Sequence, residues 1–292
     1  MAFETLLPTA ELAAHLDDPD WAIMDCRFYL DEPDRGLQAY LASHVPGAIY
    51  VHLERDLCGP IARGKGSRHS FPSVESFAVQ VAKWGIDESV QVVVYDDFQG
   101  GIAVRLWRML GWVGHKAVAL LDGGWPHWVR EGPPVQAGPV TRPPRAFVAR
   151  HRPELLISSE EALRLLASPS HLFLDTRSER SYTGQKDPDS PTSGHMPGAH
   201  HMHFTENVDQ DGLMLHADEL RAKYERLLGS RSADSVIAYC TSGVTAALNI
   251  LALQHIGLGE VRLYAGSWDE WITDPSRPVE KSPQGPGKPP RG

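Results

Sequence analysis

The amino-acid sequence predicts an α/β protein of two similar domains, each built on a mainly parallel sheet that is flanked by helices. Three observations lead to this prediction. The chain has 292 residues, which at about 150 residues per domain suggests two domains. Several short segments occur twice, in the same order. Within each half, short apolar runs alternate with amphipathic helical patterns, which is typical of a parallel sheet covered on both faces.

The repeated segments mark a duplicated domain. Each copy recurs after 143 to 151 residues, which is far too long a period for a solenoid. The pairs are Asp25–Arg27 with Asp175–Arg177, His44–Ala48 with His195–Ala199, Val92–Asp96 with Val236–Cys240, and Gly123–Trp128 with Gly266–Trp271. Composition shifts then suggest the boundaries: a first domain over 1–135, a Pro-rich linker over 136–153, a second domain over 154–275 and a flexible tail over 276–292.

The central elements of each half follow from their patterns. Short apolar runs predict strands, here at 21–25, 90–95, 117–121, 172–175, 236–239 and 261–264. Apolar residues at helical spacing predict helices, here over 73–84, 103–110, 159–166, 218–228 and 245–256. Ser73 and Ser159 are plausible N-caps of two of these helices.

Composition limits the classes of function. The net charge is -9 and we find no basic stripe, which argues against nucleic-acid binding. No apolar run approaches the roughly 18 residues of a membrane span, and the N-terminus does not resemble a signal peptide. Three cysteines in a long chain argue for a reducing compartment, so we expect a cytoplasmic protein. We expect no cofactor and no metal, although His200–His203 is rich in histidine.

Cys240 is the candidate nucleophile. It follows the strand 236–239, and ligands of parallel sheets bind beyond the carboxyl ends of strands. Gly243 permits a tight turn in which backbone N–H groups converge, and the following helix adds its positive end. A thiolate held there can accept sulfur and carry it as a persulfide. The alternative is a buried structural cysteine. Asp96 occupies the equivalent position in the first half, which predicts an inactive first domain and a catalytic second domain.

The segment Cys240–Ala246 resembles the active loop of the tandem rhodanese family, which has the pattern C-x-x-G-V-T-x. The His-x-Pro-Gly-Ala and Trp-x-x-Trp segments of both halves are also similar to that family. The resemblance implies two rhodanese-like domains and a sulfurtransferase activity. It also implies that the loop N–H groups, from Thr241 through Gly243 and Val244 to Thr245, stabilise the persulfide. By contrast, Ala246 stands where a cysteine phosphatase would have its arginine, which makes that class a poor match.

The loop side chains bear on the sulfur donor. Thiosulfate-preferring members resemble C-R-K-G-V-T, whereas Thr241 and Ser242 are neutral. The loop is closer to the C-G-S-G-V-T of 3-mercaptopyruvate sulfurtransferases, so we expect 3-mercaptopyruvate as donor and cyanide, a thiol or thioredoxin as acceptor. Two alternatives remain open at this point: thiosulfate as the donor, and a non-enzymatic persulfide carrier or partner-binding protein.

The resemblance also implies a proton relay and a carboxylate-binding residue. Asp56 and His69 match the places of an aspartate and a histidine that pair with the loop serine, here Ser242; the alternative is that His69 is a solvated loop residue. The family usually has an arginine where this chain has Ser181, and Arg180 stands one place earlier. We therefore expect Arg180 to bind the donor carboxylate; the alternative is that Arg180 is a solvated surface residue.

Overall fold

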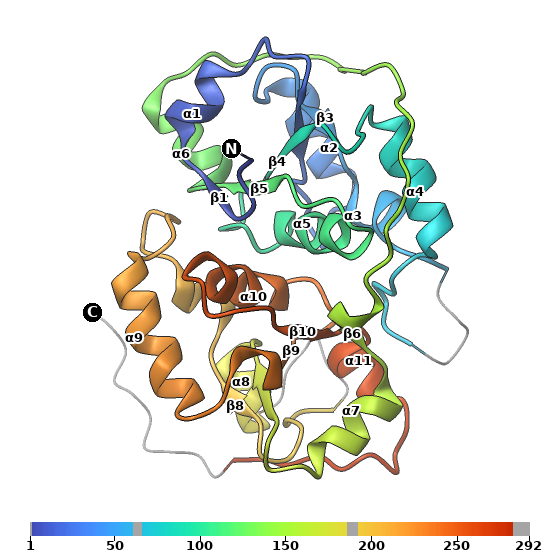
Figure 1. The fold of residues 1–292 in the computed structure, drawn as a ribbon, viewed down its shortest axis with the longest axis vertical. Helices are drawn as coiled ribbons and strands as arrows, with labels where there is room; N and C mark the ends of the chain where they lie inside the picture. Colours follow the sequence, from blue (N-terminus) through green and yellow to red (C-terminus); the bar gives the residue numbers. More distant parts are fainter. Residues whose placement is uncertain (1, 61–65, 186–191, 283–292) are drawn as a thin grey trace.

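The computed structural model describes residues 2–60, 66–185 and 192–282. Two domains stack on one another, each around a five-stranded sheet (Figure 1). The strand orders, β1-β5-β4-β2-β3 and β6-β10-β9-β7-β8, are equivalent position by position, and adjacent strands of both sheets run parallel in the described residues. The predicted fold class is confirmed.

The first domain carries the following elements: β1 (Leu6–Leu7), α1 (Thr9–Ala14), β2 (Trp21–Asp25), α2 (Arg35–Ala42), β3 (Ile49–Tyr50), α3 (Leu53–Asp56), α4 (Val74–Lys83), β4 (Gln91–Tyr95), α5 (Ala103–Trp112), β5 (Val118–Leu121) and α6 (Gly124–Glu131). The second domain carries β6 (Leu156–Ile157), α7 (Ser159–Leu166), β7 (Leu172–Asp175), α8 (Glu179–Thr183), β8 (His200–His201), α9 (Ala217–Leu228), β9 (Val236–Tyr239), α10 (Ala246–His255), β10 (Arg262–Tyr264) and α11 (Ser267–Trp271). Single 3₁₀ turns lie at Pro153–Leu155, Phe204–Asn207 and Ala233–Ser235.

The predicted central strands and long helices lie within two residues of their observed bounds. The edge strands β1, β3, β6 and β8 escaped prediction because each has only two residues, too few to show a period. Ser73 caps α4 as expected, accepting from the Ser76 N–H at 3.1 Å. The predicted cap Ser159 is wrong: Ser158 caps α7, and Ser159 lies in the first turn, where its hydroxyl donates to Glu270.

The Asp-x-Arg repeat supports each sheet at the same place. Arg27 donates to the Asp25 carboxylate and lies over the ring of Trp125. Arg177 donates to Asp175 at 2.6 Å, and its guanidinium carbon lies 4.2 Å from the centre of the Trp268 ring. Both ion pairs are buried, so these arginines are structural in the two domains.

The tail begins as part of the second domain, which corrects our expectation that 276–292 lacks fixed structure. Glu280 forms an antiparallel bridge with His195, and its carboxylate accepts from the Gly198 N–H at 2.9 Å. His44 and Gln136 form the equivalent bridge in the first domain. The bridge is therefore an element of the duplicated fold. Residues 283–292 lie outside the described residues.

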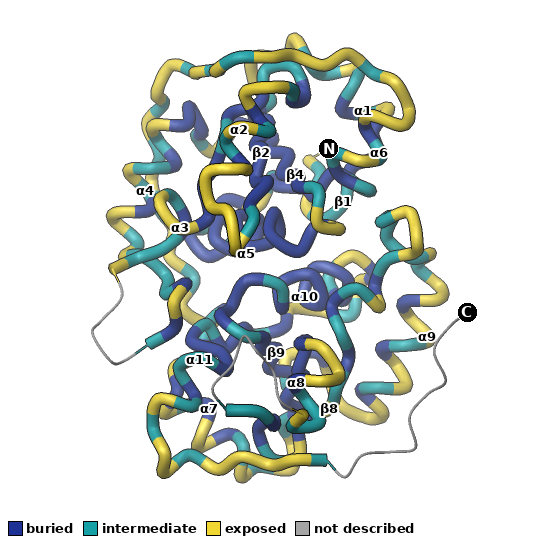
Figure 2. Tube along the Cα trace, turned by 180° about the vertical axis from the view of Figure 1, so that it is seen from behind, coloured by how far each residue is buried: buried dark blue, intermediate teal, exposed yellow. Residues whose placement is uncertain are grey.

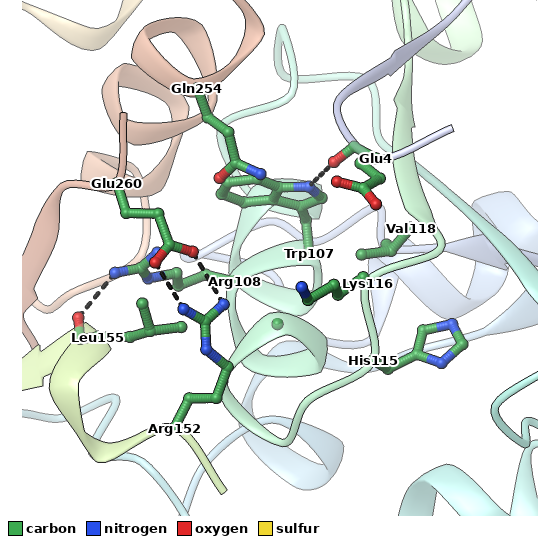
Figure 3. Close-up of a pocket in the computed structure, with 11 residues that line it drawn as sticks. Glu4, Trp107, Arg108, His115, Lys116, Val118, Arg152, Leu155, Gln254 and Glu260 are labelled. Atoms are coloured by element: carbon green, nitrogen blue, oxygen red, sulfur yellow. Dashed lines mark hydrogen bonds and ion pairs between the residues drawn. The ribbon is translucent and has the colours of Figure 1, made fainter. Parts of the chain in front are cut away.

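Helices α5 and α10 face each other where the domains meet (Figure 1). Figure 2 shows both helices as buried along most of their length. α10 carries apolar residues nearly all round, which is typical of a helix enclosed by the rest of the protein. Beside them lies a cavity of about 210 Å³ (Figure 3). There Arg108 of α5 donates to the carbonyls of Leu155 and Val261, each at 2.7 Å, and Arg152 binds both oxygens of Glu260. These contacts tie the two domains together.

Among the described helices, we find none with the length and apolar character needed to cross a membrane.

Candidate active site

Cys240 begins a tight loop between β9 and α10. Its side chain is only 2% exposed. Gly243 has φ +78°, a conformation that favours glycine, and its N–H donates to the Cys240 Sγ at 3.2 Å. The start of α11, which follows β10, packs against this loop. There the Trp268 N–H donates to the Cys240 carbonyl, and the Asp269 N–H donates to the Thr241 carbonyl. The position of the sulfur is therefore fixed by backbone on two sides.

The loop leaves several backbone donors uncommitted. Within the described residues, the N–H groups of Thr241, Ser242, Val244 and Thr245 donate to no protein acceptor. These amides lie between Cys240 and the N-terminus of α10, which begins at Ala246. Converging amides at a helix N-terminus form a site for an anion.

The equivalent loop of the first domain, one residue longer, holds a carboxyl group. Asp96 follows β4 as Cys240 follows β9, and its carboxylate is buried. It accepts four backbone N–H bonds of 2.7–2.8 Å, from Phe98, Gly100, Ile102 and Ala103. Burial raises the pKa of Asp96, and these four hydrogen bonds offset part of that rise. This turn of the fold therefore builds an anion cradle, and the first domain fills it with its own side chain.

Ser242 meets a histidine from the other domain. The Nδ1 of His69 lies 2.7 Å from the Ser242 Oγ, and both side chains are buried. Ser67 donates to the Ser242 carbonyl at 3.2 Å and holds the two segments together. Burial, with the charges of Arg105 and Arg68, lowers the pKa of His69 to about 3. The imidazole is therefore neutral at physiological pH.

Asp56, the third residue of the predicted relay, makes its hydrogen bond elsewhere in the described residues. Its carboxylate accepts from the His52 N–H at 2.7 Å, and burial raises its pKa. The carboxylate oxygen recorded near the His69 Nε2 is that of Glu54, at 3.9 Å. That separation is too long for a hydrogen bond, and a neutral imidazole makes no ion pair with it. In the described residues the Nε2 of His69 is buried without a partner.

A cavity of about 270 Å³ opens beside Cys240 and is lined by both domains. Its described lining comprises Leu30, Asp31, Leu53, Arg68, His69, Phe98, Ile102, Cys240, Thr241, Ser242, Val244 and Thr245. Arg180 is not part of this lining; it is exposed on α8. The prediction that Arg180 binds the donor is therefore not supported. Arg68 faces the cavity instead, and its place beside His69 in the chain could have suggested it.

Sequence comparison gives the family of both halves. The rhodanese-like domain matches residues 8–131 and 158–274, most of the chain. The chain belongs to the rhodanese family. It is 40% identical over 280 residues to a probable 3-mercaptopyruvate sulfurtransferase of Pseudomonas aeruginosa, covering 96% of this chain and 99% of the relative. It is 35% identical over 285 residues to a putative thiosulfate sulfurtransferase of Mycobacterium tuberculosis, covering 94% and 96%.

Solved structures agree with this family. The structure of SseA, a 3-mercaptopyruvate sulfurtransferase of Escherichia coli, matches with a TM-score of 0.77 and 31% identity, covering 90% of this chain and 98% of that one. The named relatives include enzymes of both donor types. Their names alone therefore do not choose the donor.

Arg105 joins the two rhodanese domains at the cysteine loop, and no sequence pattern pointed to it. It is fully buried on α5. Its Nη1 donates to the Gly243 carbonyl at 2.9 Å, and its Nη2 to the carbonyls of Leu57 and His69 at 3.2 and 2.8 Å. Burial lowers its pKa to about 10, so it stays charged. One cation thus holds the cysteine loop and the histidine loop in register.

Replacing Arg105 with methionine should weaken both stability and turnover. The change leaves three buried carbonyls without their donor. We therefore expect the free energy of unfolding to fall by about 2 kcal/mol and kcat to fall about 10-fold or more. Denaturant unfolding and steady-state turnover measure the two effects. Arg164→Met, at an arginine that is 71% exposed, is the control and should change stability by less than about 0.5 kcal/mol. Equal results for the two variants would contradict the role of Arg105.

Proposed function

We propose that the chain moves sulfur from 3-mercaptopyruvate to a thiophilic acceptor through a persulfide on Cys240. One observation carries the proposal: the carboxylate of Asp96 fills the equivalent cradle. A carboxylate oxygen lies two bonds beyond Cβ, and so does the outer sulfur of a cysteine persulfide. The thiol of Cys240 ends one bond short of that position. The amides that hold the Asp96 oxygens thus have counterparts around a persulfide anion.

In the first half-reaction, the Cys240 thiolate attacks the sulfur of 3-mercaptopyruvate. The new S–S bond forms as the carbon–sulfur bond breaks, and the electron pair leaves on pyruvate enolate. The proton of the donor thiol ends on the enolate carbon, which gives pyruvate and an anionic persulfide. In the second half-reaction, the acceptor takes the outer sulfur; cyanide becomes thiocyanate and Cys240 returns as thiolate. We propose cyanide, small thiols and thioredoxin as acceptors.

Ser242 and His69 are suited to move that proton. Their 2.7 Å contact links a hydroxyl to a neutral imidazole, which can both donate and accept. The hydroxyl lines the cavity beside Cys240. A 3-mercaptopyruvate donor needs this step, whereas the sulfite released from thiosulfate needs no proton. The proton step therefore favours 3-mercaptopyruvate as the donor. The neutral side chains of Thr241 and Ser242 favour it as well, because they place no cation beside Cys240 for a thiosulfate dianion.

Comparing donors tests this proposal. With cyanide as acceptor, we expect kcat/KM for 3-mercaptopyruvate to exceed that for thiosulfate by at least about 10-fold, with double-displacement kinetics. The reverse order would make thiosulfate the donor. Turnover of neither, with sulfur loading of Cys240 only from a partner protein, would favour a persulfide carrier.

The proton step gives a second prediction. His69→Ala and Ser242→Ala should each lower kcat for 3-mercaptopyruvate about 100-fold and change thiosulfate turnover much less. Equal losses with both donors would mean that the pair only supports the loop.

Because the pKa of His69 is about 3, its protonation cannot shape the rate between pH 5 and 8. The wild-type and Ser242→Ala profiles of kcat should therefore lack an inflection from His69 in that range.

The same lowered pKa affects stability. An unfolded histidine binds a proton near pH 6.5, whereas folded His69 does so only near pH 3. The unfolded state therefore gains protons first, and the contribution of neutral His69 is lost as pH falls from about 6.5 towards 3. His69→Ala should make the stability decline less steeply in that window than it does for the wild type.

A further inference from the structure

A second cavity lies at the domain interface, away from the cysteine loop. Its volume is about 210 Å³, and none of its described lining residues belongs to the cavity beside Cys240 (Figure 3). We propose that this interface cavity binds a phosphate group, free or carried on a small molecule, and that the ligand bridges the two domains. The site is separate from the proposed sulfur transfer and does not depend on it.

Cations outnumber carboxylates around the interface cavity. Arg108 of α5, Lys116 before β5 and Arg152 of the linker line it, together with Glu4 and Glu260. Figure 3 shows Lys116 and Arg152 pointing into the cavity from opposite sides. Arg152 already binds both oxygens of Glu260. In the described residues, Lys116 is exposed and forms no ion pair, so its charge is available to a ligand.

Arg108 gives the clearest indication that an anion belongs in this cavity. Its side chain is only 3% exposed, and burial lowers its pKa to about 10, so it stays charged. Its Nη2 donates to two backbone carbonyls, those of Leu155 and Val261. Its Nε is buried without a partner, and its Nη1 makes no hydrogen bond within the described part of the chain. A buried cation without a paired anion is costly, so a bound anion would stabilise Arg108.

The available donors suit a tetrahedral anion better than a planar one. An arginine binds a carboxylate in bidentate geometry through one of two edges, and Nη2 belongs to both edges. In Arg108 that atom is taken by carbonyls. In Arg152 all three nitrogens donate to Glu154 or Glu260. The Nη1 of Arg108 and the amine of Lys116 remain as two separate donors. A phosphate accepts single bonds from several directions, and lysine commonly binds phosphate as a point charge.

The rest of the lining is neutral and leaves room beside a phosphate. It comprises Trp107, Gly111, His115, Val118, Leu155 and Gln254. Burial lowers the pKa of His115, so the imidazole adds no charge near pH 7. The cavity is several times larger than the roughly 30 Å³ that a water molecule occupies. An organic group attached to the phosphate would therefore pack against the apolar members of this lining, such as Trp107 and Val118.

The interface cavity lies at the far end of the helices that support the cysteine loop. Gln254, in the last turn of α10, lines the cavity, whereas α10 begins at Ala246 directly after the loop. Eight residues at 1.5 Å each place about 12 Å between these two positions. On α5, Arg108 lies three residues after Arg105, on the same face of the helix. A ligand here would thus join the two domains without contacting Cys240.

A phosphate titration at constant ionic strength, balanced with sodium chloride and followed by thermal unfolding, tests the site. We expect the unfolding midpoint of the wild type to rise by about 2 °C or more and then to saturate. A general salt effect would instead grow without saturation and be equal in every variant. Lys116→Gln should weaken the apparent phosphate affinity at least about 10-fold, and Lys116→Arg should retain most of it. Lys83→Gln, at an exposed lysine of α4 that does not line the cavity, is the control and should match the wild type.

Other anions define the ligand. Acetate should give no saturable shift at concentrations where phosphate saturates, and an equal response to acetate would overturn the assignment to phosphate. Phenyl phosphate that binds more tightly than inorganic phosphate would identify an ester as the ligand, and the reverse order would identify the free ion. Equal phosphate affinities of the wild type and Lys116→Gln would overturn the site. Phosphate bound at the cysteine loop would give that result and would also slow the alkylation of Cys240 by iodoacetamide.

Discussion

Replacing Cys240 with serine is expected to abolish sulfur transfer, lowering kcat by at least about 10⁴-fold. A serine hydroxyl is nearly the same size, so the buried position should keep its packing, but oxygen at this site cannot attack sulfur and carry it onward. Turnover of 3-mercaptopyruvate with cyanide measures the loss, and the thermal unfolding midpoint should change little.

Cys58→Ser is the matched control for this experiment. Cys58 is half-buried, its thiol donates to the Leu53 carbonyl, and burial raises its pKa to about 11. Such a thiol stays protonated and unreactive at neutral pH. We expect activity within about 2-fold of the wild type. Residual turnover in Cys240→Ser that disappears only when Cys58 is also replaced would move the nucleophile to Cys58.

Gly243→Ala should have the next largest effect, because a methyl group cannot fit there. With φ +78°, a Cβ at this position would lie 2.3 Å from the backbone carbonyl oxygen of Ala265, so the loop has to shift. The shift would break the 3.2 Å bond from the Gly243 N–H to the sulfur. We expect kcat to fall at least about 100-fold and stability to fall by about 1–3 kcal/mol. Turnover and denaturant unfolding measure both quantities.

Gly257→Ala separates the steric contact from the cost of the left-handed backbone. Gly257 has φ +72°, close to that of Gly243, but an added Cβ would meet nothing within 4 Å. It should lose about 1 kcal/mol of stability and keep its activity. Similar kinetic losses in the two variants would show that close packing against Ala265 does not shape the cradle.

Much of the fold could be predicted because its information is local. Central strands such as β4 and β9 are almost entirely apolar, and the repeat places each element twice. The two-residue edge strands and the Glu280 bridge depend on partners far away in the chain, so no local period marks them. Ser158 and Ser159 are both reasonable caps, and only the backbone geometry distinguishes them.

The site was predictable where a residue lies inside the repeated loop and less so across the domain interface. The position of Cys240 after a strand, with Gly243 three residues later, indicated the cradle directly. The His69–Ser242 contact was expected only from a family resemblance. The same resemblance implied Asp56, whose carboxylate accepts from the His52 N–H in the structure. Arg105 lies in a helix that is apolar apart from this residue and Arg108, and its bond to Gly243 spans 138 residues. No pattern in one domain could reveal that contact.

The central claim is that the amides around Cys240 hold a persulfide as their counterparts hold the Asp96 carboxylate. Intact and peptide mass spectrometry of the protein after exposure to 3-mercaptopyruvate and removal of excess donor tests it most directly. The claim predicts one additional sulfur atom on the peptide that contains Cys240, lost again when cyanide is added. An unchanged mass, or sulfur found on Cys26 or Cys58 instead, would contradict it.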